Sequence, residues 1–340
     1  MDKEKLNNIN SDETEINPGY IWPDWYHLLS KFQVSNNLKG TWQVLNTTIP
    51  YFCLWYLIIR SIQLGYSYKV TLLLIMTAAA FLVRMFILFH DCAHNSLFTS
   101  RNMNIVIGYF FSVFLCISFA DWRFTHLRHH WMYANLDSRG YGDVWTMTKK
   151  EYENSSTLQR LRYRVYRNPL VLFAFGAFLL SKRPEYFMVK PRERVDIILT
   201  YMVIAAVAFT ASNFIGWSTY FLIQLPVLWF AGGVGVWLFY LNHQFEGGYW
   251  ARKDDWNPLS AALKGSSFLK LPAVLNWFSS NIGYHHLHHL NPVIPNYNLR
   301  ECFNTVMALQ AKDPTTITKV LNCFSLKLWD EDMQKMVPFP

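Results

Sequence analysis

The chain has 340 residues, of which 52% are hydrophobic, 17% are aromatic and only 16% are charged. Soluble domains usually carry about 25% charged residues, so this composition argues against a purely soluble protein and favours a membrane protein. The formal net charge is +8, and we expect no nucleic-acid partner. The five cysteines show no paired spacing, and an odd count without a secretory signal argues against a disulfide framework.

The first 18 residues are polar and charged and contain no apolar core, so they fit neither a signal peptide nor a membrane anchor. We predict that residues 1–18 form a disordered tail and that residues 19–340 form a single membrane-embedded domain. Trp22, Trp25 and Tyr26 come before the first long apolar stretch. Because aromatic side chains gather at membrane surfaces, these three residues predict a surface-lying anchor.

Four apolar stretches are long enough to cross a membrane, since a span needs about 20 residues to cover about 30 Å of hydrocarbon. They cover residues 45–62, 70–89, 195–214 and 220–241. Two further apolar stretches, 105–120 and 170–180, are shorter, and a helix as long as the first would extend only about 24 Å. We predict an all-α membrane protein with four transmembrane helices, short interfacial helices and a cytosolic helical cap.

Ten of the eleven histidines fall into four short clusters. The clusters are His90 and His94 in HDCAH, His126, His129 and His130 in HLRHH, His243 in NHQFE, and His285, His286, His288 and His289 in HHLHH. Residues three or four positions apart project from the same face of a helix, so each cluster can direct its imidazoles at a common point. This spacing is typical of metal ligands.

The histidine clusters can meet only if they lie on the same side of the membrane. This condition holds if the four long stretches cross and the two short ones stay peripheral. Residues 121–194 contain 14 Lys or Arg, whereas the turn at 216–219 contains none. Since cytosolic loops carry the excess of positive charge, this distribution predicts that all the clusters face the cytosol.

Nine or ten imidazoles exceed the needs of one structural zinc, which takes four ligands. Imidazole suits zinc, copper, iron and nickel, whereas magnesium and calcium prefer oxygen ligands. Nine or ten imidazoles are enough to bind two metal ions and to leave coordination positions open for a small molecule. A nitrogen-rich site with few carboxylates, opening from a membrane protein, favours redox iron that handles dioxygen over hydrolytic zinc.

The motifs HDCAH, HLRHH and HHLHH in a four-span chain resemble the three histidine boxes of the integral membrane fatty acid desaturases, a di-iron family. Residues 241–299 are similar to bacterial acyl-lipid desaturases, and the resemblance covers about residues 42–321. It implies two iron ions, dioxygen, a fatty acyl lipid substrate in a bent apolar tunnel, and a cis double bond as product. A bacterial inner membrane is the implied location.

The resemblance carries metal-ligand roles onto nine residues. They are His90, His94, His126, His129, His130, His243, His285, His288 and His289. His286 is surplus, because on a helix it would point about 100° away from the other members of its box. Asn242 stands where many relatives have Gln, and whether it reaches the metal through water stays open. No catalytic residue is expected beyond the ligands.

Metal-bound histidines usually need a partner on the second ring nitrogen. Six polar residues near the boxes are candidates for this role: Asp91, Asp121, Asp137, Asn242, Glu246 and Asn281. For the three aspartates the alternative is an ordinary salt bridge with Arg123, Arg128 or Arg139. Glu246 is placed three residues after His243, where a continuing helix would put both on one face.

The sequence contains no haem-binding His-Pro pair, no cysteine cluster for iron and sulfur, and no glycine-rich nucleotide turn, so electrons must come from an external donor. The positive charge would suit an acidic ferredoxin. It would equally suit contact with anionic membrane lipids. Two other functions remain open: a sister lipid oxygenase, such as a hydroxylase, acetylenase or carotenoid ketolase, and a histidine-rich metal transporter.

Overall fold

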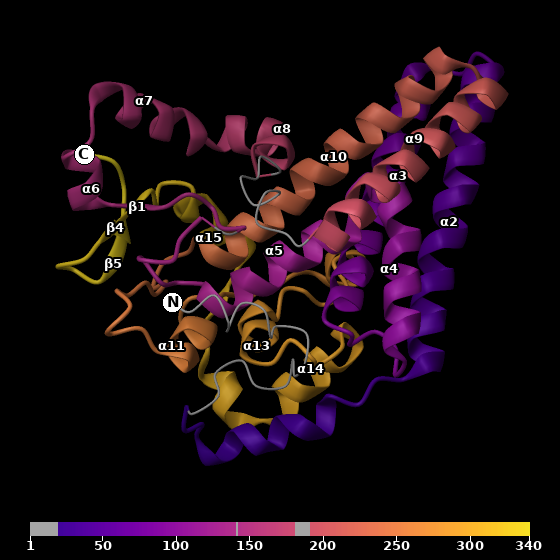
Figure 1. Cartoon of the computed structure of the whole chain (residues 1–340). Coiled ribbons are helices and arrows are strands. Elements are labelled where there is room, and N and C mark those ends of the chain that lie inside the picture. The colour runs from indigo at the N-terminus through magenta and orange to yellow at the C-terminus, as the bar shows by residue number, and fades with distance from the viewer. Residues whose placement is uncertain (1–19, 141, 181–190) are drawn as a thin grey trace.

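The structure is a computed structural model that describes residues 20–140, 142–180 and 191–340, and it is mostly helical (Figure 1). The predicted tail at 1–18 lies outside the described residues. The helices are η1 (Asp24–Phe32), α2 (Asn37–Gln63), α3 (Tyr68–Ala93), α4 (Arg101–Leu115), α5 (Phe119–Met132), α6 (Lys149–Glu153), α7 (Thr157–Tyr166), α8 (Pro169–Leu180), α9 (Pro191–Ile215), α10 (Trp217–His243), α11 (Pro258–Leu263), α12 (Ala273–Phe278), α13 (His285–Leu290), α14 (Asn296–Thr305), η3 (Met307–Ala311) and α15 (Ile317–Cys323).

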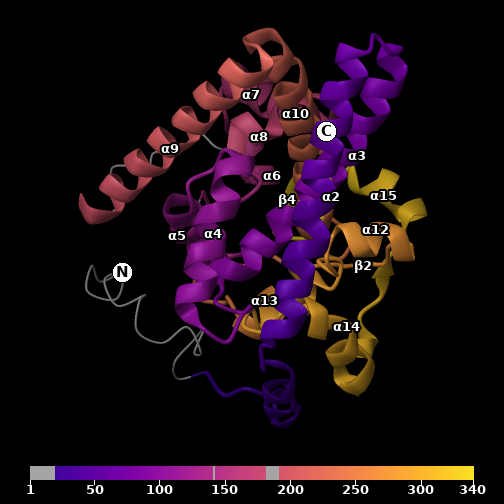
Figure 2. The same ribbon diagram turned by 90° about the vertical axis from the view of Figure 1, so that its right-hand side faces the viewer.

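Four long helices, α2, α3, α9 and α10, meet at the upper right of Figure 1, and Figure 2 shows α9 running away from α2 and α3. Helix α3 packs against α2, α4 and α10. The α2–α3 turn contains Gly65 and the α9–α10 turn contains Gly216, both with positive φ angles, of 68° and 87°. Glycine suits these positions because it has no Cβ to clash in the left-handed region.

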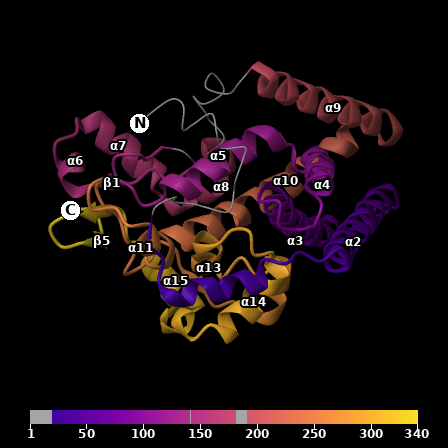
Figure 3. The same cartoon turned by 60° about the horizontal axis from the view of Figure 1, so that its bottom comes forward.

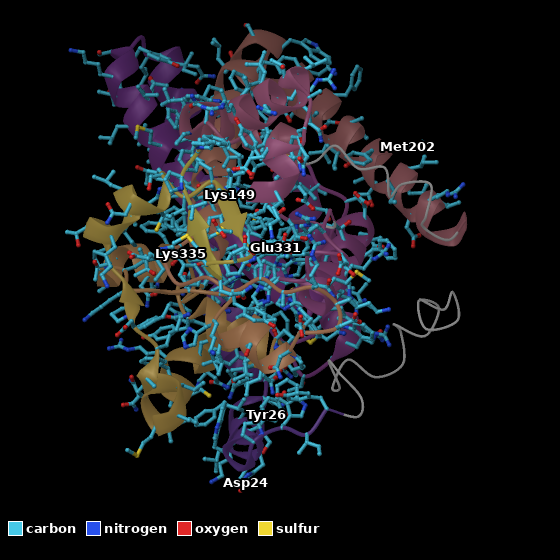
Figure 4. The ribbon with its side chains drawn as sticks, turned by 90° about the vertical axis from the view of Figure 1, so that its left-hand side faces the viewer. Asp24, Tyr26, Lys149, Met202, Glu331 and Lys335 are labelled. Atoms are coloured by element: carbon cyan, nitrogen blue, oxygen red, sulfur yellow. The ribbon has the colours of Figure 1, made fainter. Side chains whose placement is uncertain are left out.

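Among the described residues, three helical segments are long and apolar enough to cross a membrane: residues 68–93, 194–215 and 217–243. The bent pair α4 and α5 would add a fourth if the two helices form one broken span. The three long segments coincide with three of the four predicted spans. Helix α2 covers the fourth predicted span but does not reach the same hydropathy, since polar residues such as Gln43, Asn46 and Arg60 interrupt it. The outer face of α9 is apolar and exposed, and Figure 4 shows Met202 on that side, where 62% of its surface is accessible.

The predicted short stretch 105–120 is divided between two helices. Helix α4 ends at Leu115, Cys116 takes a left-handed conformation, and the axis then turns by 104° into α5. The side chain of Ser118 caps α5 by accepting a hydrogen bond from the Asp121 amide. This bend matters for the site, because it directs the three histidines of α5 back toward the end of α3.

We call residues 119–166 and 244–340, together with η1, the cap. It contains short strands that the all-α prediction missed: β1 (Met147–Thr148), β2 (Phe268–Leu269), β3 (Pro314–Thr315), β4 (Leu328–Asp330) and β5 (Lys335–Val337). The strand order is β1-β4-β5 in one sheet, with β1 parallel and β5 antiparallel to β4, and β2 pairs with β3 in parallel. Strands of two or three residues are too short to leave a period in the sequence.

The aromatic segment before α2 packs on the cap. Trp22, Trp25 and Tyr26 pack against a buried cluster that includes Leu287 and Leu290 of α13. Figure 3 shows η1 running beside α13 and α14. An amphipathic aromatic segment fits a protein core as well as a lipid surface, and these three side chains are only partly buried, so the surface anchor stays a prediction.

Candidate metal centre

Five histidines from three helices form the first group of the site. His90 and His94 stand at the end of α3, His126 and His130 lie one turn apart on α5, and His288 comes from α13. One ring nitrogen from each lies within 4.8 Å of the corresponding atom of every other member. The group is therefore compact enough to surround a single ion.

The nitrogen-to-nitrogen distances in the first group match the edges of a metal coordination shell. His126 Nε2 lies 2.9 Å from His94 Nε2 and 3.1 Å from His130 Nε2, and His130 Nε2 lies 3.0 Å from His288 Nε2. Two ligands at about 2.1 Å from a metal and at right angles are about 3.0 Å apart. One ring nitrogen has one proton or one lone pair, so it cannot bond well to two such neighbours unless a cation lies between them.

The second group contains His129 of α5, His243 at the end of α10, and His289 of α13. His129 Nε2 is 3.2 Å from His243 Nε2. His285 falls outside the 4.8 Å limit that defines this group, but its Nε2 lies 2.9 Å from His243 Nε2. Its ring centre is also 4.6 Å from that of His289. Four imidazoles therefore surround the second position.

The two groups are neighbours rather than separate sites. The ring of His130 in the first group stacks on the ring of His289 in the second, with centres 4.2 Å apart. All nine residues expected as ligands are thus brought together, from four segments far apart in the sequence. The requirement that the boxes share one side of the helical bundle is met.

Several ring nitrogens at the site are buried and have no hydrogen-bond partner among the described residues, including Nε2 of His90 and Nε2 of His289. Leaving such atoms unpaired costs free energy, which a bound cation would recover. Burial lowers the pKa of His285, His288 and His289 well below the ordinary value of 6.5, and neighbouring histidines lower it further. These rings are therefore neutral, which is the form that binds metal.

Asp143 was missed by the sequence analysis. Its Oδ1 lies 2.6 Å from His129 Nδ1, and the carboxylate is only 4% exposed. It follows Gly140 and Gly142, both with positive φ, of 106° and 70°, so the loop folds back onto α5. The available signal was an acid placed directly after two glycines, GYGD, downstream of the second box.

Asp91 occupies the corresponding place on the first group. Its Oδ1 is 3.2 Å from His90 Nδ1, while its Oδ2 accepts hydrogen bonds of 2.8 Å from both the backbone and the side-chain amide of Asn296. Gln43 of α2 bonds to the same Asn296 side chain. Asn281 does not bond to a histidine; its amide donates to the Asn296 carbonyl at 3.0 Å. It therefore supports the site one step further away.

Two predicted partners of the histidines, Asp137 and Glu246, do not pair with a histidine in the described structure. Asp137 accepts hydrogen bonds from Arg252 at 2.7 Å and from the Lys253 amide at 2.9 Å, so it forms the alternative salt bridge, but with Arg252 rather than Arg139. Helix α10 ends at His243, so Glu246 does not lie on the same helical face as His243. The side chain of Glu246 is exposed.

The remaining polar candidates differ in how directly they approach the site. Asn242 is buried beside His243, and its Oδ1 accepts a weak bond of 3.4 Å from Ser267. Asp121 lies in the first turn of α5, and its role stays a prediction. His286 is fully buried near the rings of Phe268 and Phe303, and neither of its ring nitrogens has a partner among the described residues.

The chain is similar to proteins of one known family. Residues 67–320 match the family model described as fatty acid desaturase. A fatty acid desaturase of Bacillus subtilis is 40% identical over 300 residues, which cover 87% of this chain and 85% of that protein.

More distant relatives occur in plants and cyanobacteria. An endoplasmic reticulum omega-3 fatty acid desaturase of Nicotiana tabacum is 28% identical over 237 residues, covering 64% of this chain and 59% of that protein. An sn-1 acyl-lipid omega-3 desaturase (ferredoxin) of Synechocystis is 26% identical over 239 residues, covering 65% and 63%. This chain thus spans less than two thirds of these two relatives.

Proposed function

This chain belongs to the fatty acid desaturase family, and we propose that it introduces a cis double bond into an acyl chain of a membrane lipid. Two hydrogens leave adjacent methylenes, and dioxygen becomes two waters with two protons and two electrons from an external donor. The observation that carries the proposal is the meeting of nine imidazoles, eight of them buried and that of His126 half-buried, in two adjoining groups. This arrangement can hold two ions. The ligand atoms that it offers are ring nitrogens, with almost no carboxylates among them.

The residues fit two iron ions. One would be held by His90, His94, His126, His130 and His288, and the other by His129, His243, His285 and His289. Bound iron would supply the activation of dioxygen and the removal of hydrogen. The chain's own task is to fix the imidazoles: Asp143 holds the ring of His129, and Asp91 holds the ring of His90.

An aromatic wall at the first group is suited to positioning the substrate. Trp122 stacks on His126 with ring centres 4.3 Å apart, and Phe86 and Phe89 pack on Trp122 at 5.3 and 5.1 Å. One methylene resembles the next and contributes only about 0.8 kcal/mol on burial, so the reacting pair must be selected by depth of insertion. We propose that this wall excludes water and fixes that depth.

We further propose that α2 crosses the membrane with α3, α9 and α10, and that the cap lies on the cytosolic face of a bacterial inner membrane. The end of α3 and the end of α10 both carry site histidines, which supports a shared side. The external donor is proposed to be a ferredoxin, since a relative named for ferredoxin covers 65% of this chain. Residues 19–340 would form one domain.

The direct test is expression in a bacterium whose lipids have a defined fatty acid composition. Mass spectrometry of the lipids should show acyl chains lighter by two hydrogens, with a cis double bond at one position. Hydroxylated acyl chains without new unsaturation would contradict desaturation and favour a sister oxygenase. Unchanged lipids together with altered cellular metal content would favour transport.

The metal proposal has its own test, which does not depend on activity. The purified protein should contain close to two irons per chain, and a strong chelator should remove both. Reloading with ferrous iron should restore the same stoichiometry. A single tightly held zinc would contradict the proposed ligand sets.

A further inference from the structure

Helix α7 exposes an apolar stripe that no described residue covers. Tyr163 is fully buried on the inner side, while Leu158, Leu161 and Val165 are 57%, 57% and 50% exposed. At about 100° per residue, these three lie between about 140° and 160° from Tyr163 around the helix axis. The apolar residues therefore form one narrow stripe directed outward.

Arginines border this stripe on both sides. Arg162 and Arg164 lie about 100° from Tyr163 in opposite directions around the helix. Arg164 donates to Tyr152 and to Pro340, so it is partly held by the protein. Arg162 is exposed and forms no ion pair with any described residue. An aliphatic stripe with a cation on either side is typical of a helix that lies in a membrane surface.

The position of α7 agrees with this. Figure 1 shows α7 along the upper edge of the cap, on the side from which the long helices project. The chain continues into α8, where Leu170 is 80% and Phe175 is 57% exposed. Helix α8 is fixed to the span α10, because Trp229 donates to the Ala174 carbonyl at 2.9 Å. The apolar stripe thus leads directly to surface that faces lipid.

We propose that α7 lies in the membrane surface, with Leu158, Leu161 and Val165 among the acyl chains and its arginines on anionic phospholipid headgroups. An acidic protein would pair with the arginines but would have to cover the aliphatic stripe between them as well. A lipid surface satisfies both, because hydrocarbon and phosphate lie side by side there. This inference concerns how the protein lies in the membrane and does not require the proposed desaturase activity.

The contact would also set the depth of the metal centre. Arg167, which follows α7 and is fully buried, donates to Gln244 at 2.7 Å and to the Leu326 carbonyl at 2.9 Å. Gln244 directly follows His243. Helix α7 is therefore held rigidly relative to the second histidine group, so a headgroup bound to α7 lies at a fixed place relative to the site.

The test places a spin label on α7 in lipid nanodiscs. Leu161→Cys is made in a Cys53→Ser background, because Cys53 is the exposed native thiol among the described residues. The matched control is Glu301→Cys, at an exposed position of α14. We expect the label at 161 to collide more with oxygen and less with a water-soluble nickel complex than the label at 301. Equal exposure of both labels to the nickel complex would overturn the proposal.

A second measurement tests the headgroup. Arg162→Gln should reduce the preference for spin-labelled phosphatidylglycerol over phosphatidylcholine about fivefold, the effect of about 1 kcal/mol for one arginine near an anionic surface. The control Arg300→Gln, at an exposed position of α14, should leave the lipid preference unchanged. An unaltered lipid preference would contradict the proposed contact between Arg162 and anionic headgroups. If Arg162→Gln instead raised only the KM for an acidic ferredoxin, α7 would be a donor-docking surface and the proposal would be wrong.

Discussion

Asp143→Ala is expected to weaken iron binding at the second histidine group by 10- to 100-fold, the usual cost of removing a residue that orients a metal-bound histidine. The carboxylate is 2.6 Å from His129 Nδ1 and nearly fully buried, so no water can readily replace it. Without it, the His129 ring loses the partner that fixes its tautomer and its angle. Iron analysis during titration with a chelator should show one iron leaving well before the other.

Asp137→Ala is the matched control. It removes a carboxylate from the same loop, but this carboxylate accepts a hydrogen bond from Arg252 and does not pair with a histidine. Exposed ion pairs contribute little to stability, so this variant should keep both irons and unfold at nearly the same temperature as the unaltered protein. If Asp137→Ala lost iron and Asp143→Ala did not, the assignment of Asp143 would be wrong. Asp143→Glu should retain part of the affinity.

The difference between these two aspartates shows where sequence reasoning ends. The histidine boxes could be predicted because their spacing follows the helical period, and local periodicity is visible in one sequence. Asp137 and Asp143 both follow the second box and look equivalent as letters. Which of them returns to α5 is decided by a loop with two left-handed glycines, Gly140 and Gly142, and this geometry leaves no periodic pattern.

The fold shows the same division. Hydropathy located the segments that became α3, α9 and α10, because a long apolar helix is a property of composition. It could not foresee that Cys116 would bend the chain by 104°. Nor could it decide what the aromatic segment around Trp25 covers, since lipid and a buried cluster demand the same side chains.

His126→Ala is expected to abolish new double bonds and to lower the iron content from about two to about one per chain. His126 is central to the first group: its Nε2 lies 2.9 Å from His94 Nε2 and 3.1 Å from His130 Nε2. Removing it leaves four imidazoles around a gap, and the ring that stacks on Trp122 is lost as well. The variant protein should still fractionate with the membrane, which separates loss of the site from loss of folding.

His286→Leu is the control within the histidine-rich segments, and it tests the ligand set from the opposite direction. His286 is fully buried, yet neither ring nitrogen has a partner among the described residues. Leucine has a similar volume and no polar atom, so the free energy of unfolding should change by less than about 1.5 kcal/mol. Both irons and full product formation should persist. Loss of one iron from His286→Leu, with two retained in His126→Ala, would mean that the fourth histidine segment faces the metals in a different register.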